Sequence, residues 1–347
     1  MSTIKEISDR ANVSIATVSK VLNGKPGVNS ETASHVLRIA DELHYRPNLN
    51  ARNLKVGSSR TLGIITEDLT VFNAPEIVDG IAATCDEKEY HYILGNLRLN
   101  KRYGNGIRDD VESAALVHAT VNDMLSKQVA GIIYIGCHSH IVVSLSEHAE
   151  PRFVCAYCIS ADETIPSVLY DDRSAARDVT ELLLNKGHTR IGMISGPADS
   201  PHANNRLQGY QEALFSHGVL YDPRLAVYGD WDRDSGYALA GKLLEMGVTA
   251  IFAQNDVMAT GVMDYCSQAG VEVGRDLALS GFDNREISTV CRPRLTTVAL
   301  PLFEIGERAA RIMFEILENG EAPVPAETLL SCSIIEREST GGLLCRK

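Results

Sequence analysis

The sequence lacks long hydrophobic runs and is poor in aromatic residues. No stretch of the 347 residues approaches the roughly 18 uninterrupted apolar positions that a membrane-spanning helix needs. Charged side chains interrupt residues 1–20, so the apolar core of a secretory signal peptide is also missing. Aromatic residues make up 6% of the chain, and Trp231 is the single tryptophan. We therefore expect a cytoplasmic protein without a membrane partner.

Cysteines are scattered and lack the spacing of a zinc site. The chain has eight, and without an export signal we expect reduced thiols. Cys155 and Cys158 form one C-x-x-C pair, but no second pair follows at zinc-finger spacing, and their apolar neighbours indicate a buried strand. The run 137–140 (CHSH) also contains metal-ligand residue types, but it follows a predicted strand in a polar loop. We favour packing and loop roles over metal or redox use, and we expect no cofactor.

Motifs of nucleotide-binding and hydrolytic enzymes are missing as well. No GxGxxG follows a predicted strand, and no GxxxxGK[ST] phosphate loop is present. No Ser or Cys stands in a GxSxG setting. An enzyme is therefore the weaker interpretation, and we predict no catalytic residues.

Charge is distributed unevenly along the chain. The formal net charge of −12 would by itself argue against a nucleic-acid partner. Residues 1–60, however, carry nine Lys or Arg against five Asp or Glu, a net charge of +4, and the remaining residues carry −16. A basic head on an acidic body indicates two functions in one chain.

The basic head contains signals for three short helices. Residues 3–6 (TIKE) form a capping-box sequence. Ser14 suits the N-cap of a second helix that runs through Leu22, and Ser30 is expected to cap a third. Two capped helices joined by a short turn match the helix-turn-helix pattern, so we predict a DNA-binding domain over residues 1–47.

The second helix of such a domain lies in the major groove with its N-terminal residues at the base edges. Lys20 can donate hydrogen bonds to guanine, whereas Ile15 and Ala16 offer apolar contact, for instance to a thymine methyl group. The side chains sized for phosphate contacts are Ser14, Thr17 and Ser19. The alternative is a small helical domain with a solvated basic face.

Beyond a polar, basic link over residues 48–60, strands alternate with helices. The first series of predicted strands is 61–66, 91–95, 130–136, 152–157 and 166–170. The second series is 190–195, 225–228, 249–253, 277–281 and 295–299. Predicted helices include 173–186, 205–217, 235–246, 257–269 and 302–318, and a loop after Leu97 leads to a helix from about Val111. Such alternation predicts an α/β body with parallel sheets, and two series predict two lobes.

Polar and aromatic side chains follow several predicted strands, where open α/β sheets bind ligands. In the second series they are Arg206, Trp231, Asn255 and Asp283, and in the first series they are Phe72, Asn73 and Tyr157. A carboxylate, an amide and a guanidinium can hold several hydroxyl groups while an indole stacks on a sugar ring or a base. Arg206 and Asp283 could instead form a structural ion pair. Asp172, at the expected crossover between lobes, fits either role.

Many segments resemble the LacI/GalR family of bacterial transcription regulators. In the head they are residues 3–7 (TIKEI), 11–14 (ANVS), 16–19 (ATVS), 21–23 (VLN), 45–48 (YRPN) and 51–54 (ARNL). In the body they are residues 186–192 (KGHTRIG), 206–210 (RLQGY), 255–259 (NDVMA), 281–284 (GFDN) and 293–298 (PRLTTV). The resemblance covers nearly the whole chain except about residues 97–115, where roughly a dozen residues are extra.

The resemblance implies a homodimer on a near-palindromic double-stranded DNA operator. It implies that residues 48–60 are a hinge in which residues 50–55 form a helix only on DNA. Leu54 would then be pushed into the minor groove, and an apolar wedge of that kind kinks a duplex. The further DNA contacts that it implies are Asn23, Asn50, Arg52 and Lys55. The alternative for Leu54 is a linker residue covered by the body.

The resemblance also implies a body, residues 61–347, shaped like a periplasmic binding protein. Its first lobe is expected at about 61–171 and 301–331, and its second at about 172–300 and 332–347. A small effector between the lobes would control operator affinity as inducer or corepressor. Ser200 and His202 lie where purine-sensing relatives bind ligand, but their surroundings do not match, so a sugar or sugar derivative is favoured over a nucleobase. The alternative is a solute receptor of the same body fold without a DNA role.

Overall fold

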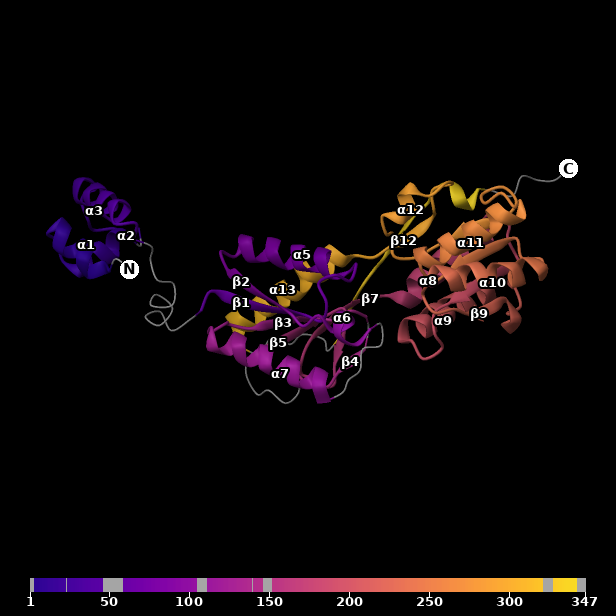
Figure 1. The fold of residues 1–347 in the computed structure, drawn as a ribbon, viewed down its shortest axis with the longest axis horizontal. Helices are drawn as coiled ribbons and strands as arrows, with labels where there is room; N and C mark the ends of the chain where they lie inside the picture. Colours follow the sequence, from indigo (N-terminus) through magenta and orange to yellow (C-terminus); the bar gives the residue numbers. More distant parts are fainter. Residues whose placement is uncertain are drawn as a thin grey trace. The chain divides into compact units, whose positions relative to one another are not determined.

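The structure is a computed structural model that describes residues 3–22, 24–45, 59–104, 111–138, 140–145, 152–320 and 327–341. Its contacts divide the chain into two units, residues 1–60 and residues 61–347, which Figure 1 colours along the sequence. We call them the head and the body and describe each by itself. Among the described residues, no helix is both long and apolar enough to cross a membrane.

The head packs three helices around one small core. They are α1 (Ile4–Ala11), α2 (Ile15–Leu22) and α3 (Ser30–Glu42). The predicted capping box is present, because Glu6 N donates to Thr3 Oγ1 at 3.2 Å and Thr3 N donates to Glu6 Oε2 at 3.3 Å. The cap of α3 is Asn29, whose Oδ1 accepts from Thr32 N at 2.8 Å, so the prediction of Ser30 was one residue too late. The buried core side chains are Ile7, Ala11, Val18, Val36, Ile39 and Ala40.

The body contains two parallel sheets, each at the centre of one lobe. The first sheet has the strand order β13-β7-β5-β3-β1-β2. Its strands are β1 (Thr61–Thr66), β2 (His91–Asn96), β3 (Ile132–Ile135), β5 (Phe153–Ala156), β7 (Ser167–Tyr170) and β13 (Glu327–Leu330). The helices of this first lobe are α5 (Ala74–Glu87), α6 (Leu99–Tyr103), α7 (Val111–Ser126) and α13 (Leu302–Asn319), with α5 and α13 on one face of the sheet and α7 on the other (Figure 1).

The second lobe repeats this plan with four strands in the order β11-β10-β8-β9. The strands are β8 (Ile191–Ser195), β9 (Ala226–Tyr228), β10 (Ala250–Ala253) and β11 (Ala278–Ser280). The helices are α8 (Asp172–Asn185), α9 (Pro201–Ser216), α10 (Arg233–Glu245), α11 (Asp256–Ala269) and α12 (Ile287–Val290). The smaller elements are β4 (Ile141–Val142), β6 (Ile159–Ser160), β12 (Thr297–Ala299), β14 (Ser333–Ile335) and the 3-10 turns at Pro223–Leu225 and Glu338–Thr340.

Apolar residues run continuously along the central strands because both faces of each sheet are covered. In β1, Ile64 packs into the core under α5 and α13, whereas the next residue, Ile65, packs into the core under α7. Successive strand residues point to opposite faces, which accounts for this division. In the second lobe, Met193 and Ile194 of β8 divide in the same way. Parallel strands place their carboxyl ends at one edge of each sheet, where ligands bind in such folds.

The predicted fold class, a helical head and an α/β body of two lobes, is confirmed. Besides the cap of α3, three local predictions were wrong. Residues 295–299, expected as a strand of the second parallel series, form β12 (Thr297–Ala299), which pairs antiparallel with β14 in a separate two-stranded sheet. Residues 99–103, expected in a loop, form α6, which Leu99 anchors by burying its side chain in the core under α7. Helix α9 begins at Pro201 rather than at 205, because Ser200 Oγ accepts from Ala203 N at 3.4 Å and proline fits the first turn of a helix.

Candidate functional site

The head presents the start of α2 to solvent. Ser14 Oγ accepts from Thr17 N at 3.1 Å and so begins the helix, as predicted. Ile15 is 49% exposed, and Ala16 and Lys20 are also exposed. An exposed isoleucine beside a lysine at a helix start offers one apolar and one cationic contact to a groove.

The other predicted DNA contacts differ in exposure. Thr17 and Ser19 are half-buried, and the Thr17 hydroxyl lies 2.9 Å from the exposed Ser14 hydroxyl. These two hydroxyls can therefore bind a phosphate as one polar unit. The predicted contacts Asn23, Asn50, Arg52, Leu54 and Lys55 lie outside the described residues.

In the body, Arg206 is the centre of a buried polar network at the carboxyl ends of the second-lobe strands. Its Nε donates to Asp172 Oδ1 at 2.6 Å, and its Nη2 donates to the Tyr170 hydroxyl at 2.8 Å. Its Nη1 donates to the carbonyl oxygen of Gln254. The guanidinium also lies 3.7 Å from the centre of the Phe282 ring, a cation–π contact. Three fixed hydrogen bonds and one ring hold the Arg206 side chain in a single orientation.

Asp172 joins this network to α9. Its Oδ2 lies 2.5 Å from Nδ1 of His202, whose ring stacks on that of Tyr170 at 5.5 Å between centres. Burial opposes ionisation of Asp172. His202 and Arg206 outweigh it through their charges and hydrogen bonds, and they hold the pKa of Asp172 below the ordinary aspartate value. Asp172 is therefore an anion committed to Arg206 and His202, which supports the structural role considered for it.

Asp283 faces the same guanidinium without bonding to it. Its Oδ1 lies 3.9 Å from Nη2 of Arg206, beyond hydrogen-bond distance. Burial raises the pKa of Asp283 to about 8, which Arg206 lowers only in part and the nearby Asp256 raises further. The proposed structural ion pair of Arg206 is thus made with Asp172. Asp283 is a neutral acid at pH 7, with a proton to donate.

Trp231 closes one side of this site. Its indole packs directly on Gly196, where a β-carbon would overlap the ring. The Arg206 guanidinium lies 5.7 Å from the indole centre. Asn255 donates from Nδ2 to the Trp231 carbonyl oxygen at 2.9 Å and caps α11 by accepting from Met258 N at 2.7 Å. Both functional groups of Asn255 are therefore used in positioning Trp231 and α11.

The first lobe contributes an aromatic and an amide wall. Tyr157 stacks against Tyr170 at 5.4 Å between ring centres and lies 5.9 Å from the His202 ring. Asn73 is fully buried; its Nδ2 donates to Gly136 O at 2.9 Å, and its Oδ1 has no hydrogen-bond partner among the described residues. An unsatisfied buried acceptor is costly unless a ligand or water pairs with it.

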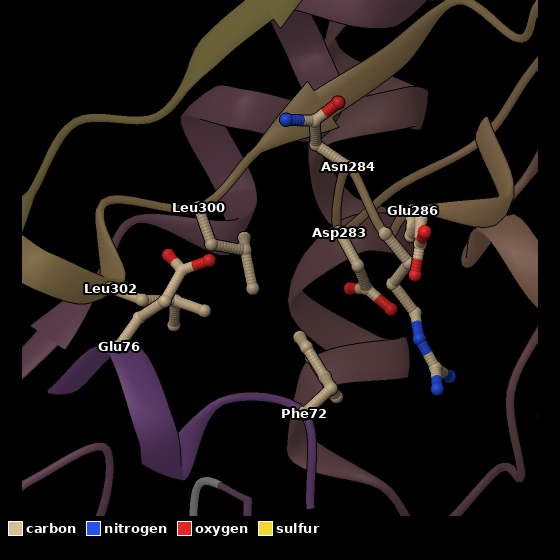
Figure 2. Close-up of a pocket in the computed structure, with 8 residues that line it drawn as sticks. Phe72, Glu76, Asp283, Asn284, Glu286, Leu300 and Leu302 are labelled. Carbon is tan, nitrogen blue, oxygen red and sulfur yellow. The ribbon is translucent and has the colours of Figure 1, made fainter. Parts of the chain in front are cut away.

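A hollow of about 290 Å³ opens between the two lobes. Figure 2 shows Phe72 from the first lobe and Asp283 from the second pointing toward one another across it. The Arg285 guanidinium lies 5.1 Å from the Phe72 ring centre. The remaining lining residues are Glu76, Asn284, Glu286, Leu300 and Leu302.

Strained backbone marks the same site. Tyr157, Trp231, Asp283 and Asn284 have φ values of 65°, 73°, 101° and 52°. Side chains other than glycine rarely adopt positive φ, and such strain gathers at ligand sites. Three of these four residues were predicted site residues, so the strain supports their grouping.

Of the predicted site residues, Phe72 and Asp283 line the hollow. Arg206, Trp231 and Tyr157 belong to the buried network beside Asp283, and Asn73 is bonded to Gly136. Asn255 supports them from behind Trp231. Sequence reasoning missed Tyr170 and Gln254, and it placed no role on the Phe282 ring beneath Arg206. The run 281–284 was singled out, but nothing in it distinguishes a ring that binds a cation from an ordinary core phenylalanine.

The cysteine segments pack as predicted. Cys155 and Cys158 are fully buried free thiols. Burial raises the pKa of the Cys158 thiol well above its usual value, which disfavours the reactive thiolate. Among the described residues, no three His, Cys, Asp or Glu side chains gather in a way that could hold a metal ion.

Comparison with known proteins shows the origin of this arrangement. The model for bacterial regulatory proteins of the lacI family matches residues 3–48, and the model for a periplasmic binding protein-like domain matches residues 180–340. The HTH-type transcriptional repressor CytR of Escherichia coli K12 is 31% identical over 345 residues, which cover 99% of this chain and 97% of the relative. The chain belongs to the LacI family. It is a DNA-binding transcription regulator with an effector-binding body.

Two further members of the family are similar to this chain over most of its length. Catabolite control protein A of Priestia megaterium is 37% identical over 323 residues, 91% of this chain and 93% of the relative. The crystal structure of the lac repressor dimer bound to operator and the anti-inducer ONPF aligns with a TM-score of 0.79 at 25% identity. That alignment covers 98% of this chain and 99% of the repressor chain.

Proposed function

We propose that this regulator is a repressor that binds a near-palindromic operator as a homodimer and is controlled by a neutral sugar or sugar derivative in its cleft. The operator contacts are the α2 residues described above together with the predicted hinge contacts. The effector contacts are Phe72, Asn73, Tyr157, Arg206, Trp231 and Asp283, with Asn255 in support.

One observation carries the choice of effector: the charges of the buried network formed by Arg206, Asp172 and Asp283 cancel. Arg206 is paired with Asp172 at 2.6 Å, whereas Asp283 keeps its proton at pH 7. The site therefore offers a neutral donor in Asp283, an unpaired acceptor in Asn73 and an aromatic face in Trp231. Hydroxyl groups can satisfy both the donor and the acceptor, and a sugar ring can stack on the indole.

The control of DNA binding would be transmitted by the lobes. An effector that contacts Phe72 on the first lobe and Asp283 on the second stabilises one lobe arrangement over another. In a dimer, that arrangement sets the spacing of the two hinge segments. A coupling of about 1–3 kcal/mol changes operator affinity about 5- to 150-fold. Either sign of coupling fits this scheme.

The same contacts support a binding role rather than catalysis. Asp172 bonds to both His202 and Arg206, so the polar atoms of these three side chains are used in holding one another in place. We therefore propose no enzymatic activity and no cofactor. A DNA partner also supports a cytoplasmic location.

Operator selection with the full chain tests the DNA role. Random duplexes are selected at two salt concentrations and sequenced. We expect a consensus with two-fold symmetry and retention that falls steeply with salt, because phosphate contacts release counterions. A solute receptor of the same fold would select no consensus, and that outcome would contradict the proposal.

A thermal-shift screen of neutral monosaccharides and disaccharides tests the effector role. A bound sugar raises the unfolding temperature of the full chain, since it binds the folded state. The same sugar should leave Arg206→Ala and Asp283→Ala unchanged, while the exposed control Arg224→Ala responds as wild type does. An equal response in the two cleft variants would refute the assignment of the cleft.

A further inference from the structure

Glu67, directly after β1, is a buried carboxylate with three hydrogen-bond donors. It is 1% exposed. The Tyr134 hydroxyl donates to Oε1 at 2.9 Å, and Cys137 N donates to Oε2 at 2.7 Å. Nε2 of His140 lies 3.0 Å from Oε1. A buried carboxylate persists only when it is hydrogen-bonded and its charge is balanced. His140 is the cationic residue type in contact with it.

The hydrogen bonds of His140 specify its protonation state. Nδ1 lies 2.8 Å from the carbonyl oxygen of His138, while Nε2 faces the Glu67 carboxylate. Both partners are acceptors only, so both ring nitrogens must donate. A neutral imidazole carries one hydrogen and would place a lone pair against one of these oxygens. The site is therefore built for imidazolium.

Glu67 also joins three segments of the first lobe. Its backbone N donates to Ile135 O at 3.1 Å, and its carbonyl oxygen accepts from Leu99 N at 2.8 Å. The loop after β1 continues from Glu67 to Phe72 and Asn73. Asn73 is bonded in turn to Gly136, at the end of β3, at 2.9 Å. The carboxylate thus fixes the β1 and β3 loops against one another where the cleft wall begins.

We propose that Glu67 and His140 form a proton-dependent clasp that positions the first-lobe wall of the effector cleft. While His140 is imidazolium, the clasp holds Phe72 and Asn73 in place. As pH rises and the ring loses its second hydrogen, one acceptor contact becomes repulsive and the wall loosens. This inference rests on the proposed effector function, because it gives that cleft a dependence on pH.

The other titratable groups around the clasp keep one charge state near neutral pH. Burial, together with the nearby charges of His140 and His202, lowers the pKa of His138 to about 4. The His138 ring is tilted against that of His140. Burial raises the pKa of the Tyr134 hydroxyl and of the Cys137 and Cys158 thiols. Burial alone would raise the pKa of Glu67, but the bonds from His140, Cys137 and Tyr134 lower it. Hydrogen bonds from Thr70 lower the pKa of Asp68, and Lys101 adds a distant positive charge.

Nitrogen NMR of the full chain with 15N-labelled histidine tests the protonation state. His140→Gln assigns the signal, and the exposed His44 serves as the internal reference. We expect both ring nitrogens of His140 to keep their hydrogens at pH values above about 6.5, the ordinary pKa of an imidazole. A neutral His140 ring at pH 7 would overturn the clasp.

Hydrogen exchange of the full chain tests the positioning role. We expect the protection of residues 67–73, corrected for intrinsic exchange rates, to fall about tenfold between pH 6 and pH 9 in the wild type. His140→Gln keeps a neutral donor to Glu67, so its protection should not change with pH. Protection in His140→Gln that falls with pH as it does in the wild type would refute the proposal. Neither measurement needs an effector or an operator, so failure of the clasp is distinguished from failure of the proposed function.

Discussion

The Nη2 atom of Arg206 lies 3.9 Å from Oδ1 of Asp283, although both side chains are buried. The guanidinium bonds to Asp172 instead, and burial, which the charge of Arg206 offsets only in part, raises the pKa of Asp283 to about 8. The buried network of Arg206, Asp172 and Asp283 is therefore electrically neutral near pH 7. This neutrality determines which ligands the cleft can accept and how its stability depends on pH.

Replacing Asp283 with asparagine should stabilise the protein in mild alkali. The folded-state pKa of Asp283 is raised from 3.8 to about 8, so the folded chain holds this proton more tightly than the unfolded chain. The contribution of this proton to the free energy of unfolding is fully present below pH 3.8, the unfolded-state pKa, and is lost as pH rises through about 8. Since a difference of one pKa unit corresponds to about 1.4 kcal/mol, we expect Asp283→Asn to raise the free energy of unfolding at pH 8 by up to about 5 kcal/mol.

Denaturant unfolding at several pH values measures this effect. The exposed Asp234→Asn serves as the control and should show no such gain. A wild-type free energy of unfolding that rises between pH 6 and pH 8 faster than that of Asp283→Asn would contradict the assignment.

Replacing Asp172 with asparagine should lower the free energy of unfolding. The substitution leaves Arg206 buried without its ion-pair partner, which costs about 3–5 kcal/mol. Asp283 then becomes the remaining anion for Arg206, and its pKa should fall. Because the pKa of Asp172 is lowered on folding, its contribution is present above the ordinary aspartate value and is lost as pH falls. The exposed pair of Asp222 and Arg224 provides the control, since Asp222→Asn should cost far less.

Replacing Gly196 with alanine should displace Trp231. A β-carbon at this position would overlap the indole ring. Because Trp231 is the only tryptophan, the intrinsic fluorescence spectrum reports its environment directly, and we expect a red shift with weaker sugar binding. Gly192→Ala in the preceding strand β8 meets the side-chain ends of Leu243 and Val248 and not the indole, so it should leave the spectrum unchanged. An unshifted spectrum in Gly196→Ala would contradict the packing.

Replacing Lys20 with alanine should relax operator selectivity but leave effector binding intact. A base contact by a lysine is worth about 1–3 kcal/mol of discrimination. Quantitative binding to the selected operator and to a variant with one changed base pair would measure this loss. Lys25, which lies beyond the end of α2, provides a matched control, because Lys25→Ala should weaken both duplexes equally.

Local patterns predicted most of the fold. Strands such as β1 and β8 were found because a strand that is covered on both faces is apolar throughout. The bounds of β1 were as predicted, and β8 begins one residue later than predicted. Capping signals at Thr3 and Ser14 located the first two helices. The α3 cap was displaced because Asn29 and Ser30 are both good caps, and only the contact with Thr32 decides between them.

The site was predictable in its members but not in its bonding. Arg206 and Asp283 follow strands, which is a local signal. The commitment of Arg206 to Asp172 was not predictable, because it depends on α8 and α9 meeting beside β7. Glu67 and His140 are likewise joined only by the neighbouring positions of β1 and β3 in the sheet.

The strand order of the first sheet has a consequence for synthesis of the chain. Strand β13 pairs with β7 although nearly the whole second lobe separates them in sequence. During translation the head, whose core is complete by residue 45, can fold early, since domains fold as units from the N-terminus. The first lobe must wait for α13 and β13. A chain that ends between the head and β13 has a complete DNA-binding head but an incomplete first lobe. Such a chain could bind DNA without responding to an effector.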